Sequence, residues 1–132
     1  MGGHAVYVRW KRRTRGPDRW GKERGAVLDA VLVASARADG RVRQRFICHL
    51  GRVTEDEADR DHIRVRFWRD VASRLAGGYA VGGQAYIVTP EVRSRIEQAL
   101  AARVPKPTPE EIAAADAAGR ALWTTGGPPP VM

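Results

Sequence analysis

The sequence predicts an α+β fold in which a three-stranded antiparallel sheet packs on an amphipathic helix and is followed by two further helices. Residues 27–50 hold two runs rich in β-branched and aromatic residues around Asp39-Gly40, the dipeptide that a two-residue hairpin turn favours. Residues 60–76 repeat an apolar side chain at about every fourth position, as an amphipathic helix does. We expect residues 1–104 to form one domain, residues 105–123 an appended helix and residues 124–132 a flexible tail.

The first strand is expected at residues 5–13, where apolar and polar side chains alternate. One side of this strand is apolar and the other becomes increasingly basic. The apolar set is Val6, Val8 and Trp10, and the opposite set is Tyr7, Arg9, Lys11 and Arg13. Residues 14–25 then form a loop rich in Gly, Pro and Asp. In one interpretation, Trp20 and basic residues of this loop such as Lys22 contact phosphates and bases. In the other, the loop is solvated and the Trp20 indole folds back onto the sheet.

The hairpin of residues 27–50 sets the register of the predicted sheet. With Asp39 and Gly40 as the turn, Ala38 lies opposite Arg41, whereas a three-residue loop with a bulge would shift the partners by one. The further pairs on one face are Ala36–Arg43, Ala34–Arg45, Leu32–Ile47 and Ala30–His49, and those on the other face are Ser35–Gln44, Val33–Phe46, Val31–Cys48 and Asp29–Leu50.

The two sets of pairs lie on opposite faces because side chains alternate across a strand. One face is apolar and is the expected core face, which turns Gln44 inward. The other face holds arginines among alanines and is expected to form an open cationic surface for a phosphate backbone. The core candidates are Val31, Val33, Val42, Phe46, Cys48 and Leu50, and the arginines are Arg41, Arg43 and Arg45.

The helix of residues 60–76 is expected to cover the apolar face of the sheet. Asp59 or Asp61 is expected to cap it, because carboxylates suit a helix N-terminus. Its arginines fall mostly outside the apolar stripe and are expected to be solvated. The stripe is Ile63, Phe67, Val71 and Leu75, and the arginines are Arg64, Arg66, Arg69 and Arg74.

Turn and cap signals divide the rest of the chain. Residues 77–88 form either a small hairpin turned by Gly82-Gly83 or a loop. Thr89-Pro90 begins a helix that reaches about residue 103. Thr108, with Glu111 three residues later, matches a capping box and begins the third helix.

Leu32–Gly51, with the sequence LVASARADGRVRQRFICHLG, resembles a segment near the N-terminus of insertion-sequence transposases that have an RNase H-like (DDE) catalytic domain. The Arg-Val-Arg-Gln-Arg and Leu-Gly parts carry the resemblance most specifically. A chain of 132 residues is too short to hold that catalytic domain. The resemblance therefore implies an accessory or DNA-handling module of a mobile element or phage, and the chain otherwise resembles small bacterial proteins.

The net charge of +8 is concentrated in the first part of the chain. Residues 1–53 contain 13 Lys and Arg against 4 Asp and Glu, whereas residues 54–132 contain 10 against 11. An excess of positive charge that is confined to the predicted sheet favours a polyanion-binding face. A membrane span and a signal peptide are not expected, and a single cysteine favours a reducing, cytoplasmic compartment.

No motif indicates an enzyme. The three histidines and Cys48 lack metal-ligand spacing, and Cys48 is expected to be a packed thiol. His49 either touches a phosphate or has no role. A nuclease cluster of Asp59, Asp61 and His62 is a weaker interpretation, because acidic residues at the start of a helix are more often caps. We expect no catalytic residue, cofactor or metal.

The predicted function is non-enzymatic nucleic-acid binding, with duplex DNA lying on the basic face of the sheet. RNA is a second possibility, although Tyr7 is the only aromatic ring expected on that face. Alternatives are a small interaction module, an inhibitor or adaptor that docks an acidic protein partner, and a basic protein with no specific polyanion. The candidate contact residues are Arg9, Lys11, Arg13, Trp20, Lys22, Arg41, Arg43 and Arg45.

Overall fold

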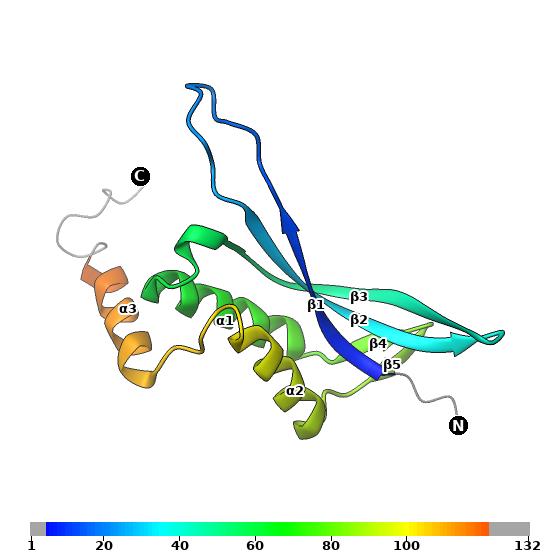
Figure 1. Ribbon diagram of the computed structural model, residues 1–132. Helices are drawn as coiled ribbons and strands as arrows, with labels where there is room; N and C mark the ends of the chain where they lie inside the picture. The colour runs from blue at the N-terminus through cyan, green and yellow to red at the C-terminus, as the bar shows by residue number, and fades with distance from the viewer. Residues whose placement is uncertain (1–4, 122–132) are drawn as a thin grey trace, which may run out of the picture.

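The computed structural model describes residues 5–121, apart from the side chains of residues 36, 38, 120 and 121, and has the expected α+β fold (Figure 1). A three-stranded antiparallel sheet of order β1-β2-β3 carries the helices on one face, and a separate hairpin forms β4 and β5. The predicted tail at 124–132 lies outside the described residues. The elements are β1 (Ala5–Arg13), β2 (Val27–Ala38), β3 (Arg41–Thr54), the 3-10 helix η1 (Glu55–Glu57), α1 (Asp61–Leu75), β4 (Tyr79–Val81), β5 (Gln84–Tyr86), α2 (Pro90–Ala101) and α3 (Pro109–Ala121).

The Asp39-Gly40 turn has the predicted backbone, and the structure decides between the two alternatives at Gly82-Gly83. Asp39 and Gly40 have φ angles of 53° and 74°, which is the left-handed pair that a type I′ turn requires. Gly82 and Gly83 have φ angles of 58° and 85°, so residues 77–88 contain a hairpin rather than a loop. The two-residue turn of the main hairpin is therefore confirmed.

Two bulges in β3 change the predicted register of the main hairpin. The pairs from Ala38–Arg41 to Val33–Phe46 are confirmed, but β3 then contributes an extra residue at two points. Each extra residue moves the following side chains to the opposite face. The predicted pairs Leu32–Ile47, Ala30–His49, Val31–Cys48 and Asp29–Leu50 are wrong, and the observed pairs are Leu32–Cys48, Ala30–Gly51, Val31–His49 and Asp29–Arg52.

The helices cover the face of β2 opposite to the predicted core face. We call the helix-covered face the inner face and the other the outer face. Val31 and Val33 are buried on the outer face, whereas Val42 and Phe46 are 60% and 64% exposed, which contradicts their assignment to the core. The bulges explain why Cys48 and Leu50 still reach the core. The inner core contains Val6, Leu28, Ala30, Leu32, Ala34, Leu50, Val53, Ile63, Phe67, Trp68, Val71, Leu75, Ile96, Leu100 and Val104.

Close packing seats α1 on the sheet. A Cβ atom on Gly51 would lie 2.7 Å from the Phe67 ring, so only glycine lets the ring approach β3 this closely. Trp10 of β1 stacks on Phe67 at 6.0 Å between ring centroids, and its indole nitrogen donates to the Ala99 carbonyl of α2 at 3.1 Å. Burial of a large apolar side chain such as Phe67 stabilises the fold by roughly 1.5–3 kcal/mol.

The caps of α2 and α3 follow the sequence, but that of α1 does not. Thr89 Oγ1 accepts from the Val92 amide at 3.2 Å, and Thr108 and Glu111 form the predicted reciprocal capping box. The N-cap of α1 is Arg60, without a side-chain bond, so neither Asp59 nor Asp61 caps this helix. Asp61 is its first residue.

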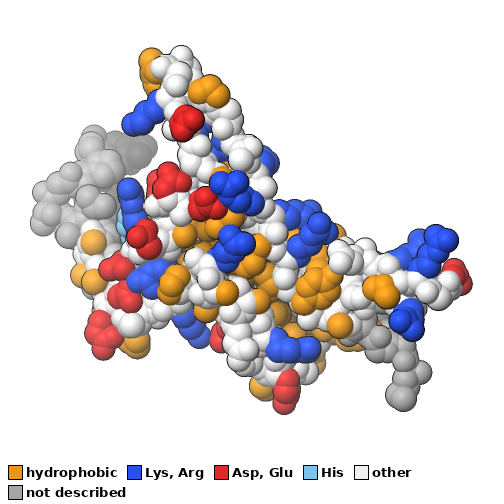
Figure 2. All heavy atoms as spheres, viewed as in Figure 1, with side chains coloured by type: hydrophobic (Ala, Val, Ile, Leu, Met, Phe, Trp, Pro, Cys, Tyr) orange, Lys and Arg blue, Asp and Glu red, His pale blue; other side chains and the backbone are white. Residues whose placement is uncertain are grey.

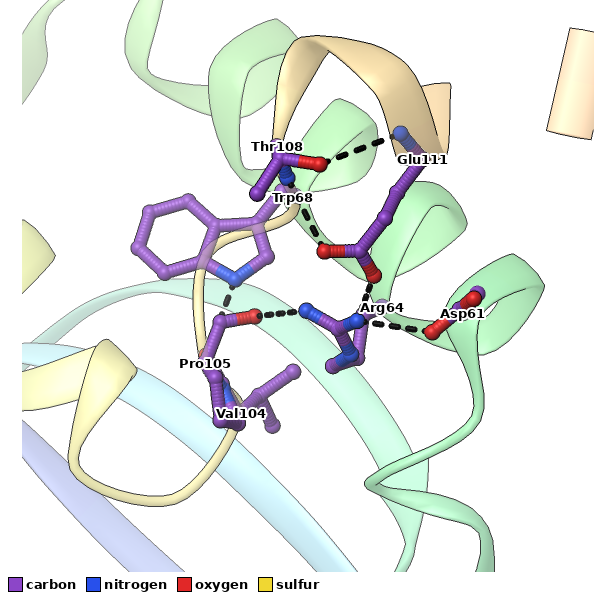
Figure 3. Close-up of polar contacts among 7 residues, drawn as sticks. All are labelled: Asp61, Arg64, Trp68, Val104, Pro105, Thr108 and Glu111. Atoms are coloured by element: carbon purple, nitrogen blue, oxygen red, sulfur yellow. Dashed lines mark hydrogen bonds and ion pairs between the residues drawn. The ribbon is translucent and has the colours of Figure 1, made fainter. Parts of the chain in front are cut away.

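An arginine that was expected to be solvated joins α1 to α3. Arg64 is only 8% exposed, and its guanidinium donates to the Asp61 carboxylate at 2.8 Å, to the Pro105 carbonyl at 3.1 Å and to the Glu111 carboxylate (Figure 3). Trp68 Nε1 beside it donates to the Val104 carbonyl at 3.0 Å. This α1–α3 junction attaches the third helix to the body.

Candidate nucleic-acid interface

The predicted cations do not share one face of the sheet. Arg45 pairs with Ala34, whose side chain belongs to the inner core, so Arg45 and its alternates Arg43 and Arg41 project on the inner side. Arg9 pairs with Val31 on the outer face. The prediction of a single basic face that combines Arg9 and Lys11 with the β3 arginines is therefore wrong. Its cause is that β2 is apolar on both faces, so alternation within β2 could not show which face the helices cover.

The end of the β2–β3 hairpin projects as a two-stranded ribbon. Within residues 5–121, β1 pairs with β2 as far as Ser35, and β2 and β3 continue past this point to their turn (Figure 1). Lys and Arg side chains gather at this end of the molecule (Figure 2). We call residues 36–45 the basic ribbon. Its exposed arginines are Arg37 on the outer side and Arg41, Arg43 and Arg45 on the inner side.

None of the four ribbon arginines forms an ion pair with another described residue. By contrast, Arg12 donates to both oxygens of Glu55 at 2.8 and 3.2 Å, and this hydrogen bonding lowers the pKa of the Glu55 carboxyl. Arg45 Nη1 lies 3.5 Å from where a Cβ on Gly82 would be, so the β4–β5 turn borders the ribbon. The ribbon therefore holds a cluster of positive charges with which no described carboxylate forms an ion pair. Like charges close together repel, so this cluster does not stabilise the fold.

The outer face has one carboxylate at its centre. Asp29 accepts from Arg52 Nε at 2.7 Å and contacts His49 Nε2 at 2.9 Å, with Arg13 Nη2 at 3.9 Å. Burial opposes ionisation of Asp29, but the hydrogen bonds from Arg52 and His49 outweigh it and lower the pKa of the carboxyl. His49 therefore has a structural partner, and the charge of Asp29 is compensated within the sheet.

The rest of the outer face is basic with an aromatic part. Arg9 Nη1 donates to Gln44 Oε1 at 3.1 Å, which contradicts the prediction that Gln44 points inward. Tyr7 and Phe46 lie on this face as the two cross-strand partners of Val33. Lys11 pairs with Asp29 in the strand register and is exposed.

Residues 14–25 project as an arm between β1 and β2 (Figure 1). Asp18 orders its tip, because Asp18 Oδ1 accepts from the amides of Trp20 and Lys22, both at 2.9 Å. Trp20 is 81% exposed, so the alternative that its indole folds back onto the sheet is wrong. The Arg19 guanidinium lies 5.4 Å from the Trp20 ring centroid.

The two arginines nearer the base of the arm donate hydrogen bonds to backbone carbonyls of the arm itself. Arg15 Nε donates to the Gly25 carbonyl at 2.8 Å, and Arg24 Nε donates to the Gly16 carbonyl at 2.7 Å. These bonds tie the two sides of the arm together. Trp20 and Lys22 therefore stay at a tip that the arm itself supports.

Sequence reasoning missed four residues of these surfaces: Arg37, Gln44, Phe46 and Arg52. Arg37 lies near the end of a mostly apolar, alanine-rich strand, and its exposure follows from the two-stranded ribbon. The other three depend on the register and on which face the helices cover. No residue of β3 is a sequence signal for its two bulges, although β3 has 14 residues and β2 has 12.

Within residues 5–121, no group of three or more His, Cys, Asp or Glu side chains could hold a metal ion. Cys48 packs beside the core, and burial raises the pKa of its thiol. Among the described helices, none is both long enough and apolar enough to span a membrane.

Comparison with known proteins found no matching family model, no similar curated protein and no similar solved structure. The resemblance of Leu32–Gly51 to transposases stays a prediction from the residues themselves.

Proposed function

We propose that the protein is a non-enzymatic nucleic-acid-binding protein that holds duplex DNA with its basic ribbon, in an accessory or regulatory role of a mobile element or phage. One observation carries the proposal. Arg37, Arg41, Arg43 and Arg45 are exposed on a projecting ribbon, and none has an acidic partner within the described part of the chain.

The dimensions of a two-stranded ribbon suit the major groove, which is about 12 Å wide and admits such a ribbon. Alternate residues of a strand are about 7 Å apart, which is close to twice the rise of about 3.4 Å per phosphate of one DNA strand along the helix axis. The guanidinium groups lie on both sides of the ribbon, so they would meet phosphates on both walls of the groove. Arginine also binds phosphate oxygens and guanine edges in a bidentate manner.

The other predicted contact residues would extend this interface. Arg9, Lys11 and Arg13 line the outer face of the sheet, and Trp20 and Lys22 lie at the tip of the arm. Their role is to add phosphate contacts along the backbone.

The test is the salt dependence of binding to a labelled duplex of about 20 base pairs. If about four phosphates are neutralised, affinity falls roughly 10²-fold between about 50 and 200 mM salt. Arg41→Ala/Arg43→Ala should reduce the slope of log affinity against log salt by about 2. The matched control is Arg60→Ala/Arg66→Ala, which removes the same charge at α1 and should leave the slope nearly unchanged.

Salt-independent binding, or equal effects of the two double variants, would contradict the proposal. If neither duplex DNA nor RNA binds at about 50 mM salt, where polyanion binding is strong, the alternative of an acidic protein partner is favoured.

A further inference from the structure

Two aromatic side chains lie level with each other on the outer face of the sheet. Tyr7 of β1 and Phe46 of β3 are both partners of Val33 in the central strand, one on each side. Neighbouring strands are about 4.8 Å apart, so the two backbone positions are about 10 Å apart. Phe46 is 64% exposed and Tyr7 is half-buried.

The exposed apolar surface beside Val33 is made of rings rather than aliphatic groups, and the exposed Val42 lies further along β3 toward the turn. Val31 and Val33, the central side chains nearest to the rings, are each only 4% exposed. A surface that docks another protein usually has a broader apolar centre depleted in charge. A pair of separated rings with cations around them instead suits flat, charged ligands.

The groups around the rings are polar and basic. The side chain of Arg9 runs diagonally across the face to Gln44, because Arg9 pairs with Val31 while Gln44 pairs with Ser35. This places a guanidinium and a carboxamide between the strands that carry Tyr7 and Phe46. Lys11, Arg13 and Arg52 follow along the same face, and the Asp29 charge is compensated by Arg52.

We propose that the outer face binds unpaired nucleobases of single-stranded nucleic acid, which stack on Phe46 and Tyr7 while Arg9 contacts the phosphates. The inference deepens the proposed nucleic-acid function and rests on it, but it uses a different surface from the basic ribbon. Every base has a flat π face, so stacking on these rings tolerates any sequence. The cationic rim is complementary to the backbone that joins the bases.

The test is binding of labelled oligo(dT) of about 12 nucleotides to the full chain, which is a length within the usual range for such surfaces. Phe46→Leu keeps an apolar side chain but removes the flat ring, and it should weaken binding roughly 5- to 100-fold. Phe46→Trp keeps a ring and should stay within about twofold of the wild type. Tyr7→Leu should weaken binding in the same way as Phe46→Leu.

The matched control is Ile87→Ala, which truncates an exposed aliphatic side chain that lies outside both the basic ribbon and the three-stranded sheet. It should leave oligo(dT) affinity unchanged. A second readout is photocrosslinking with 5-bromouracil in the oligonucleotide, where crosslinked peptides should contain Tyr7 or Phe46.

Several outcomes would overturn the inference. Unchanged oligo(dT) affinity in both Leu variants would do so, as would crosslinks confined to other peptides. If the wild type binds duplex DNA but not oligo(dT), the inference fails and the role of the ribbon stands. If Phe46→Leu abolishes self-association in a protein that does not bind oligo(dT), the face is instead an interface between two copies of the chain.

Failure of the proposed function is a separate result. A protein that binds oligo(dT) through Phe46, but whose duplex affinity is unaffected by Arg41→Ala/Arg43→Ala, would retain the outer-face site and lose the ribbon site.

Discussion

The α1–α3 junction and the basic ribbon are both built around arginine, but the surroundings of the guanidinium groups differ. At the junction, Arg64 is 8% exposed and its donors are used by Asp61, Glu111 and the Pro105 carbonyl (Figure 3). In the ribbon, the guanidinium groups are exposed, and no described carboxylate pairs with them. The comparison separates cations that stabilise the fold from cations that the fold leaves available to a ligand.

The largest expected effect is at the junction. Arg64→Ala leaves the Glu111 carboxylate and the Pro105 carbonyl without their donor, and should lower the free energy of unfolding by about 2–3 kcal/mol. Urea denaturation followed by tryptophan fluorescence measures the loss. Arg64→Met/Glu111→Met should recover part of it, because removal of both charges leaves no unpaired buried charge, although the Pro105 carbonyl still lacks its donor. A free energy of unfolding equal to that of the wild type in Arg64→Ala would show that the junction does not depend on this arginine.

A smaller effect is expected at Asp29, because its partner Arg52 is exposed and His49 is half-buried. Asp29→Asn should cost about 1 kcal/mol at neutral pH. Because the pKa of the folded carboxyl is lowered, its stabilisation is present above the unfolded pKa of about 3.9 and is lost as the pH falls through the folded value. The stabilities of wild type and variant should therefore converge once the pH has fallen below the lowered pKa of the folded carboxyl.

The control for this experiment is Asp70→Asn on α1, because Asp70 is exposed and forms no ion pair with another residue in the described part of the chain. The free energy of unfolding of Asp70→Asn should equal that of the wild type at every pH. A difference between Asp29→Asn and wild type that is constant with pH would argue against ionic stabilisation at Asp29.

The smallest effect on stability is expected in the ribbon. Arg41→Ala/Arg43→Ala should change the free energy of unfolding by less than about 0.5 kcal/mol, and any change should favour the variant because like charges are removed. The same denaturation experiment measures it. A loss of more than about 1 kcal/mol would place these arginines with Arg64 as structural groups and weaken the functional contrast.

Much of the candidate interface could be anticipated from the residues. The Arg41–Arg43–Arg45 alternation and its pairing with the end of β2 are as expected, because they lie next to a turn whose type is set by two adjacent residues. Arg9 and Lys11 also lie opposite the apolar side of β1, as predicted. What could not be anticipated is that these two groups of cations are separated by the thickness of the sheet.

The reason lies in the central strand. β2 carries apolar residues at consecutive positions, so either face could have received the helices. The alternation of β3 favoured the face of Phe46 and Val42, but the two bulges turn Cys48 and Leu50 to the other face, where they join the core. A change of one residue in register moves every later side chain across the sheet.

Signals that act within a few residues were enough to predict the Asp39-Gly40 turn, the Thr89 cap, the capping box of α3 and the apolar stripe of α1. These depend on backbone angles and hydrogen bonds between near neighbours. The tertiary structure alone decided which face of the sheet is covered, the exposure of Phe46 and the burial of Arg64. Each of these depends on contacts between segments distant in the chain, where the shape of one partner, such as the Phe67 ring against Gly51, selects the register of the other.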